Sequence, residues 1–216
     1  GVRGVSAGQV TPSRLELRPA ALVEHLPPQP ARRVLMLYDA VTGFLDERDE
    51  FGAPPAHVDG HQHVHVLPGV RIALFRALSA RGLQGVLLRD SSDTPLRIAR
   101  RRAFAAKALK VNALATGFAR SARRHGFALN HGFAGFSDFV AADYGAAQFS
   151  TYLEAPGPRH LVMCHPGRVD DALRRLDPVT EAREVELAFL ASPAFTALLA
   201  KKEMKIVRLS DWLTPR

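Results

Sequence analysis

Short apolar segments that alternate with amphipathic helical patterns constrain the fold of this chain more than any other feature of its sequence. The candidate strands are residues 56–64, 85–90, 127–130, 160–165 and 205–209. Between them, apolar residues recur at every third or fourth position, which is typical of helices that bury one face. Strands that alternate with helices predict an α/β fold with a parallel sheet.

Local signals set several helix boundaries. Thr94-Pro95 predicts a helix start, because proline is well tolerated at the first helical position. The helical pattern that follows runs to Arg124, with a break near Gly117. Ser192 is expected to cap a helix that runs through Lys202. Further helices are predicted over residues 32–51, 70–82, 142–153 and 177–190.

The chain divides into two unequal parts. Residues 1–31 contain five prolines and no sustained period, which predicts an irregular, proline-rich lead-in. Residues 32–216 are predicted to form a single α/β domain, since a chain of 216 residues that is 47% hydrophobic can bury a sizeable core.

The composition also bounds the cellular setting. No apolar run approaches the roughly 20 residues of a membrane span, so we expect a soluble protein and no membrane partner. The opening residues lack the basic and apolar regions of a signal peptide. The single cysteine, Cys164, excludes an internal disulfide and fits a reducing compartment, which leads us to expect a cytoplasmic protein.

The formal net charge is +8, and much of the excess lies in residues 97–110 and 119–124. A basic cluster can bind phosphate backbones, so a nucleic-acid-binding protein is one hypothesis. The clusters match no nucleic-acid motif, and arginine-rich helix faces in water explain them as well. We therefore do not expect nucleic acid as the partner.

A run of alternate histidines, "HVDGHQHVHVLPG", begins at His57 and ends at a Pro-Gly turn. In a strand, His61, His63 and His65 would share one face with Asp59, and neighbours on that face lie about 6.6 Å apart. Metal–nitrogen bonds are only about 2.0–2.1 Å long, so these side chains cannot all bind one ion. We expect one or two ligands at most, with Asp59 as a possible hydrogen-bond acceptor that orients a ligating imidazole. The alternative is a polar edge strand whose histidines face water.

A second histidine stands at the end of another apolar strand. The segment "LVMCHPG" delivers His165 to a carboxyl end, where parallel sheets bind their ligands. A histidine there suits general acid catalysis, because its pKa lies near neutrality. Its alternative role is an ordinary hydrogen bond in a loop. Cys164 is expected to point the other way and to pack in the interior.

Four segments together resemble the YdjC-like carbohydrate deacetylases. They are "HVDGHQHVHVLPGV", the arginine of "LLRD", "LNHGFAGFSDF" and the long segment that starts "LVMCHPGRVDD"; the likeness runs from about Val34 to Leu209. The resemblance implies a (β/α) barrel-like fold and hydrolysis of the N-acetyl group of an amino sugar or oligosaccharide. It also implies a divalent metal ion, Mg²⁺ or Zn²⁺, that polarises the amide carbonyl and activates water.

The resemblance also implies roles for particular residues. It makes His61 a metal ligand, His165 the acid that protonates the leaving amine, and Arg89 part of the pocket lining. We place His63 and His65 beside Arg89 as substrate contacts, and Asp59 as the support of His61. Aromatic residues of the segment 132–139 are expected either to line the sugar pocket or to belong to the core.

The sequence departs from the family pattern at its amino-terminal end. The family opens with a strand that ends in Ala-Asp-Asp-Phe-Gly and continues with a Gly-x-His-Leu strand, which supply further ligands and a base. Here the only Asp-Asp pair is Asp170-Asp171, and "GVRGVSAGQVT" contains no histidine. We therefore expect a barrel that is incomplete at the amino terminus, with unpaired sheet edges that could support a homodimer.

Three hypotheses follow. The first is a metal-dependent carbohydrate deacetylase whose activity is impaired by truncation. The second is a catalytically inactive remnant or binding homologue of the family. The third is the basic nucleic-acid-binding protein.

Overall fold

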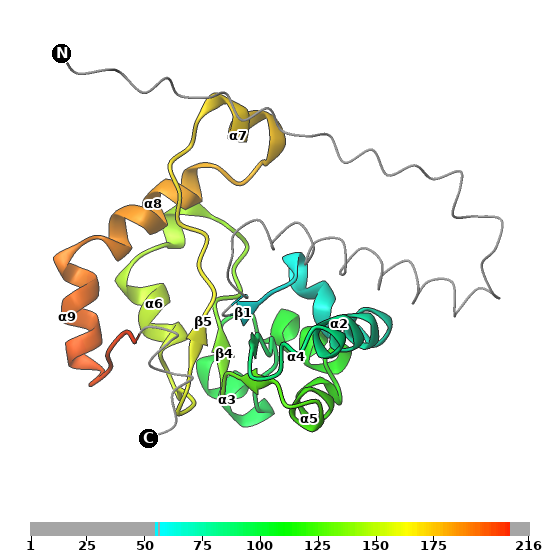
Figure 1. Cartoon of the computed structure of the whole chain (residues 1–216). Helices are drawn as coiled ribbons and strands as arrows, with labels where there is room; N and C mark the ends of the chain where they lie inside the picture. Colours follow the sequence, from blue (N-terminus) through cyan, green and yellow to red (C-terminus); the bar gives the residue numbers. More distant parts are fainter. Residues whose placement is uncertain (1–54, 56, 208–216) are drawn as a thin grey trace, which may run out of the picture.

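The computed structural model describes residues 55 and 57–207 of the chain. Parallel strands run through the middle of this part, with α2, α4 and α5 on one side and α6, α8 and α9 on the other (Figure 1). The predicted lead-in of residues 1–31 and the helix predicted over 32–51 lie outside the described residues.

The strands form two parallel sheets. The first has the order β1 (His57–Val58), β2 (Leu87–Leu88), β3 (Ala128–Leu129). The second pairs β4 (Phe133–Ala134) with β5 (Leu161–Val162). The prediction of an α/β fold with parallel strands is confirmed, while the strands of residues 57–207 do not close into a barrel.

The helices connect and cover these strands. In chain order they are η2 (His61–Val66), α2 (Pro68–Ala80), α3 (Pro95–Arg101), α4 (Ala105–Leu114), α5 (Phe118–Arg124), η3 (Ala141–Asp143), α6 (Ala146–Tyr152), α7 (Asp171–Leu176), α8 (Glu181–Leu190) and α9 (Pro193–Lys201). No helix in this part of the chain has the length and apolar character needed to cross a bilayer.

Helix boundaries follow the sequence, although Ser192, which precedes α9, makes no side-chain capping hydrogen bond. Thr94 precedes α3, and its hydroxyl accepts a hydrogen bond from the Arg97 N–H at 3.3 Å. Gly117 separates α4 from α5 with a φ of 78°, a conformation that glycine adopts without the steric cost of a side chain. Both boundaries confirm the predictions.

The core beneath the first sheet is apolar. Leu78 of α2, Leu88 of β2 and Phe118 of α5 are fully buried against one another in a single cluster. Side chains of this size contribute roughly 1.5–3 kcal/mol each when they are buried. This cluster fixes α2 and α5 against β2, and so fixes the carboxyl end of β2.

The strand predicted over residues 56–64 is wrong beyond Val58. The chain turns at Gly60 into the 3₁₀ helix η2, in which Gln62 and His63 adopt left-handed φ angles of 51° and 64°. The turn is held because His63 N–H donates to the Gly60 carbonyl at 3.1 Å. Side chains at alternate positions therefore do not share a face, and the histidines point in different directions.

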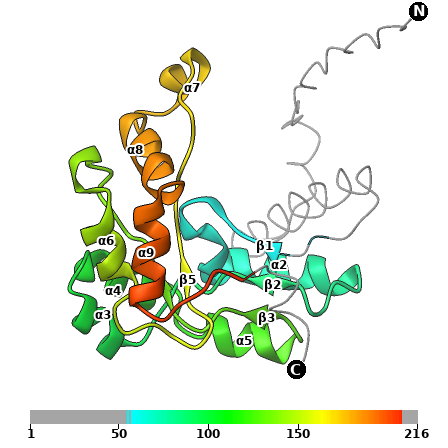
Figure 2. The same cartoon turned by 90° about the vertical axis from the view of Figure 1, so that its left-hand side faces the viewer.

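Other segments differ from the sequence predictions in smaller ways. Residues 133–134 form β4, a two-residue strand that lies between glycines and gives little alternation to detect. The helix predicted over 177–190 begins only at Glu181, because Asp177 accepts the Val179 N–H at 2.8 Å and so stabilises a turn. Helix α7 was not predicted, and it projects from the rest of the molecule beyond α8 (Figure 2). Residues 205–207 form no strand, and the rest of the predicted closing strand lies outside the described residues.

Candidate functional site

Arg89 connects the carboxyl ends of three strands. It follows β2, and its Nη2 donates to Asp59 Oδ1 at 2.6 Å and to the Gly60 carbonyl at 3.1 Å, both just after β1. Its Nη1 donates to the sulfur of Met163, just after β5, at 3.1 Å. One side chain, only 7% exposed, thus brings the two sheets together at a single site.

The guanidinium of Arg89 lies over an aromatic face. Its Cζ is 5.3 Å from the centre of the Phe133 ring, within the range of a cation–π contact. Its Nε is buried and finds no hydrogen-bond partner among the described residues. Burial lowers the pKa of Arg89 and the carboxylate of Asp59 opposes that shift, so the group keeps its positive charge.

His63 is the second member of the site. Its Nδ1 lies 3.0 Å from the hydroxyl of Ser91, and its ring contacts Phe133 and Phe136 at centroid distances of 5.7 and 5.3 Å. Burial, and then the charge of Arg89, lower the pKa of His63 to about 4. Its imidazole is therefore neutral at pH 7.

His165 is the third member, reached from β5. It is half-buried, and its ring meets the ring of Phe139 edge-on at a centroid distance of 5.0 Å. Burial lowers the pKa of His165, and the charges of Arg183 and Arg89 lower it further. A neutral imidazole in this position can take a proton from water and pass it on.

His65 has a structural role in the site. Its Nδ1 accepts the Gly60 N–H at 3.0 Å, and its Nε2 lies 2.6 Å from the Arg89 carbonyl oxygen. Both ring nitrogens are therefore engaged by the backbone, the side chain is 3% exposed, and burial lowers its pKa. This neutral ring joins the β1 turn to the end of β2, and the predicted substrate contact through His65 has no free polar atom to make it.

Asp59 lies beside Arg89. Its side chain is 43% exposed, and its Oδ1 forms the ion pair with Arg89 described above. The structure thus gives Asp59 a contact that the sequence did not indicate, and its predicted support of His61 stays a prediction.

His61 is exposed at the start of η2. Over residues 55 and 57–207, no three or more histidine, cysteine, aspartate or glutamate side chains are close enough to hold a metal ion together. The donors in this part of the chain do not by themselves make a metal centre. The predicted ligand role of His61 therefore stays a prediction.

Sequence reasoning missed Lys107 in this site. Its ammonium donates to the Ser137 carbonyl at 3.0 Å and lies 5.8 Å from the centre of the Phe139 ring. Its charge contributes to lowering the pKa values of both His63 and His165. The signal was hidden, because Lys107 belongs to a basic cluster that looked like a solvated helix face.

Another part of that cluster is buried structure. Arg101 pairs with the carboxylate of Asp93, and its Nη1 donates to the Phe133 carbonyl at 2.8 Å. The Asp93 side chain is only 3% exposed and also accepts from Arg97 Nη1 at 3.3 Å. These arginines hold α3 against β4 instead of facing a phosphate backbone, which weakens the nucleic-acid hypothesis.

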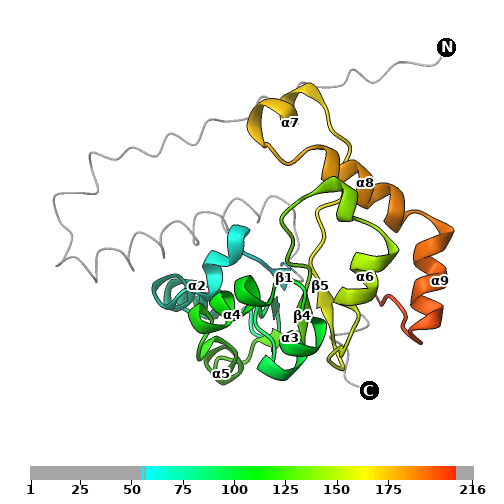
Figure 3. The same ribbon diagram turned by 180° about the vertical axis from the view of Figure 1, so that it is seen from behind.

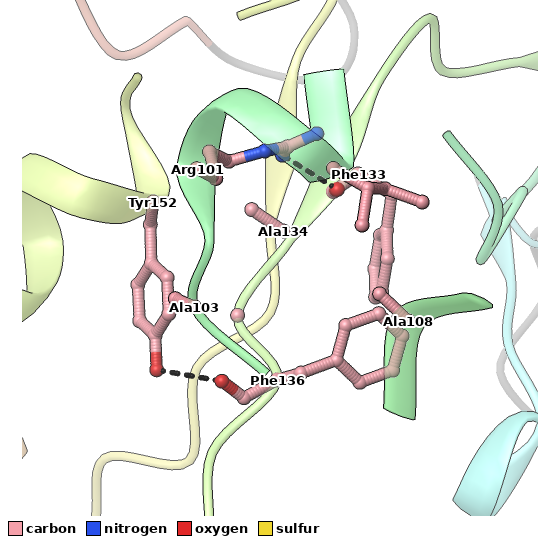
Figure 4. A pocket seen from close by; sticks show the side chains of 9 residues that line it. Arg101, Ala103, Ala108, Phe133, Ala134, Phe136 and Tyr152 are labelled. Carbon is pink, nitrogen blue, oxygen red and sulfur yellow. Dashed lines mark hydrogen bonds between the residues drawn. The ribbon is translucent and has the colours of Figure 1, made fainter. Parts of the chain in front are cut away.

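A small hollow lies next to the site, on the α3 side of β4 (Figure 4). Its lining includes Arg101, Phe133, Phe136 and Tyr152, and the Tyr152 hydroxyl donates to the Phe136 carbonyl at 3.1 Å. Apart from these groups the lining is mainly alanine and other apolar side chains. It contains none of the histidines, so the chemistry of the site lies on the other side of the two phenylalanine rings.

Comparisons with known proteins identify the family of this chain. The family model described as YdjC-like protein matches residues 45–201. A carbohydrate deacetylase of Homo sapiens is 30% identical over 185 residues, which cover 76% of this chain and 55% of that protein. A chitooligosaccharide deacetylase of Salmonella typhimurium is 28% identical over 158 residues, covering 71% of this chain and 52% of that protein. The chain thus spans about half the length of these two relatives.

A solved structure shares the fold. It is an Enterococcus faecalis protein assigned to cellobiose-phosphate cleavage, with a TM-score of 0.58 and 14% identity over 83% of this chain and 61% of that chain. At this identity the likeness concerns the fold alone.

Proposed function

Since the chain belongs to the YdjC-like protein family, we propose that it acts as a carbohydrate deacetylase that removes N-acetyl groups from amino sugars or chitooligosaccharides. The observation that carries the proposal is the position of Arg89. It joins the ends of β1, β2 and β5, and His63 and His165 follow two of these strands. The names of the human and Salmonella relatives support this substrate class.

The proposed reaction is hydrolysis of an amide. Water adds to the acetyl carbonyl carbon, the carbon–nitrogen bond breaks, and acetate and a free amine leave. His165 delivers a proton to the departing nitrogen. Since its pKa is lowered, His165 first acquires this proton from the attacking water and then passes it to the amine.

The other side chains orient the sugar. Neutral His63 can donate one hydrogen bond to the acetamido group or accept one from it, depending on which ring nitrogen faces the substrate. The charged guanidinium of Arg89 favours the negative charge that develops on the carbonyl oxygen. The rings of Phe133 and Phe136 contact His63, the ring of Phe139 contacts His165, and these contacts orient the two imidazoles.

We also propose that the activity depends on a divalent cation, Mg²⁺ or Zn²⁺, with His61 as one ligand. The described residues do not by themselves complete such a site. A cytoplasmic location and a homodimer remain part of the same proposal.

The experiment measures acetate released from N-acetylglucosamine oligomers by the 216-residue chain, with EDTA or with added Mg²⁺, Zn²⁺ or Co²⁺. The proposal expects metal-stimulated release that is lost in His61→Ala. The matched control is His125→Ala, which changes an exposed histidine remote from the site. Oligomer binding without acetate release in a folded sample would instead support a binding homologue of the family.

A further inference from the structure

Helix α8 holds the backbone of His165 at both of its polar groups. The His165 N–H donates to Glu186 Oε2 at 2.6 Å. Arg183 Nη1 donates to the His165 carbonyl at 3.4 Å. The segment that carries His165 runs from β5 along α8 toward α7 (Figure 3). Two side chains of one helix therefore fix the peptide groups on either side of this histidine.

Glu186 is an unusual residue to bury. Its side chain is 2% exposed and lies one helical turn from buried Ala182, on the inner face of α8. Burial raises the pKa of its carboxyl, and the hydrogen bond from His165 N–H opposes that shift. A buried acid costs free energy, and an apolar side chain of similar size is often equally or more stabilising at such a position. Stability alone therefore does not explain a glutamate at this position.

Arg183 is itself held in place. Its Nη2 donates to Asp177 Oδ2 at 2.5 Å, and its Nε donates to the Val179 carbonyl at 2.9 Å. The Arg183 carbonyl also accepts the Gly167 N–H at 3.2 Å. The path of the chain from His165 to Gly167 is thus fixed against the first turn of α8.

We propose that Glu186 is a positioning residue for His165. Its carboxylate sets the direction of the His165 peptide, and with it the place of the imidazole beside Phe139. The inference rests on the proposed function, in which His165 carries a proton to the departing amine. Displacements of about 1 Å in such a group can cost a reaction up to a hundredfold in rate.

Three substitutions test this role. Glu186→Leu keeps the volume and removes the acceptor, so kcat for acetate release should fall about tenfold to a hundredfold while KM stays within about twofold. Glu186→Gln keeps an oxygen that can accept the His165 N–H and should recover most of kcat. Glu184→Gln is the matched control, because Glu184 lies on the exposed side of α8 and accepts from Val169 instead.

A second measurement does not depend on activity. In Glu186→Leu the His165 amide should exchange its hydrogen faster and shift in the ¹⁵N–¹H spectrum, and in Glu184→Gln it should not. If Glu186→Leu does not fold, Glu186→Asp shortens the same carboxylate by one methylene and should give the same loss of kcat.

The outcomes separate the two proposals. Wild-type activity with an unchanged kcat in Glu186→Leu overturns the positioning role and leaves the deacetylase proposal intact. An inactive, folded wild-type chain overturns the deacetylase proposal. The amide signals then decide the positioning role, which fails if Glu186→Leu leaves the His165 resonance and its exchange unchanged.

Discussion

The histidine-rich segment at residues 57–65 and the arginine-rich segment at 97–102 look alike in the sequence, because each repeats one functional residue type. In both, the structure divides the repeated residues into two kinds. His65 and Arg101 are buried and bound to the protein's own polar groups, while His61 and Arg100 are exposed.

The two segments differ in where they lie. The histidine segment follows β1 at the carboxyl end of a parallel sheet, so half-buried His63 contacts Ser91, which follows β2, and the ring of Phe133 in β4. The arginine segment lies in α3 and faces β4 through Arg101. A cluster of one residue type therefore indicates a function only when its position in the fold is known as well.

The largest effect should come from Arg101. Arg101→Ala leaves the buried Asp93 carboxylate without its main partner and should lower the free energy of unfolding by about 3–5 kcal/mol. Urea unfolding measures the change. Arg100→Ala, one residue away and exposed, should stay within about 0.5 kcal/mol of the wild type. Equal losses of unfolding free energy in Arg101→Ala and Arg100→Ala would show that burial does not distinguish these two arginines.

His65 should come next. His65→Leu removes the partners of the Gly60 N–H and the Arg89 carbonyl and should cost about 2–4 kcal/mol of unfolding free energy. His61→Ala should leave stability within about 0.5 kcal/mol, because its side chain is exposed. A thermal melt of both variants measures this, and a stable His65→Leu protein would remove the structural role.

The stability of the protein should depend on pH because of its buried histidines. His65 and His160 each accept a backbone N–H and have a lowered pKa through burial, so the unfolded chain takes up protons that the folded chain resists. Their contribution to the free energy of unfolding is fully present above the unfolded-state pKa of about 6.5 and is lost as the pH falls below that value. Urea midpoints should decrease from pH 8 to pH 5, and less steeply in His160→Gln. If the urea midpoint falls with pH as steeply in His160→Gln as in the wild type, His160 does not contribute to the pH dependence.

The smallest effect should come from the exposed arginines. Arg100→Ser combined with Arg102→Ser should change neither stability nor function, since both side chains are exposed and lie away from the site. Fluorescence anisotropy with duplex DNA at about 150 mM salt should show only weak binding in both proteins. Tight wild-type binding that the double variant loses would revive the nucleic-acid hypothesis.

The sequence predicts much of this architecture because local rules determine it. Thr94-Pro95 and Gly117 gave correct boundaries, and the apolar run at 85–90 contains β2. The turn after Val58 could not be predicted, because alternation of histidines imitates a strand. Its real conformation depends on a long-range hydrogen bond between His65 and the Arg89 carbonyl.

The candidate site, like the fold, was predicted only in part from the sequence. His165 was found because it follows an apolar strand, and Arg89 was found through the resemblance to the deacetylase family. Ser91, Lys107 and Glu186 were missed, since their contacts with the site cross between elements that are distant in the chain. Only the packing of the helices on the sheets reveals these contacts.

The most direct test of the central claim compares His165→Asn with Cys164→Ser in the acetate-release assay. The Cys164 thiol is partly buried, and burial raises its pKa to about 12, so it stays neutral and is not expected to take part in the reaction. We predict that His165→Asn loses acetate release by at least about a hundredfold, while Cys164→Ser retains it. Full activity in a folded His165→Asn protein would contradict the proposed site.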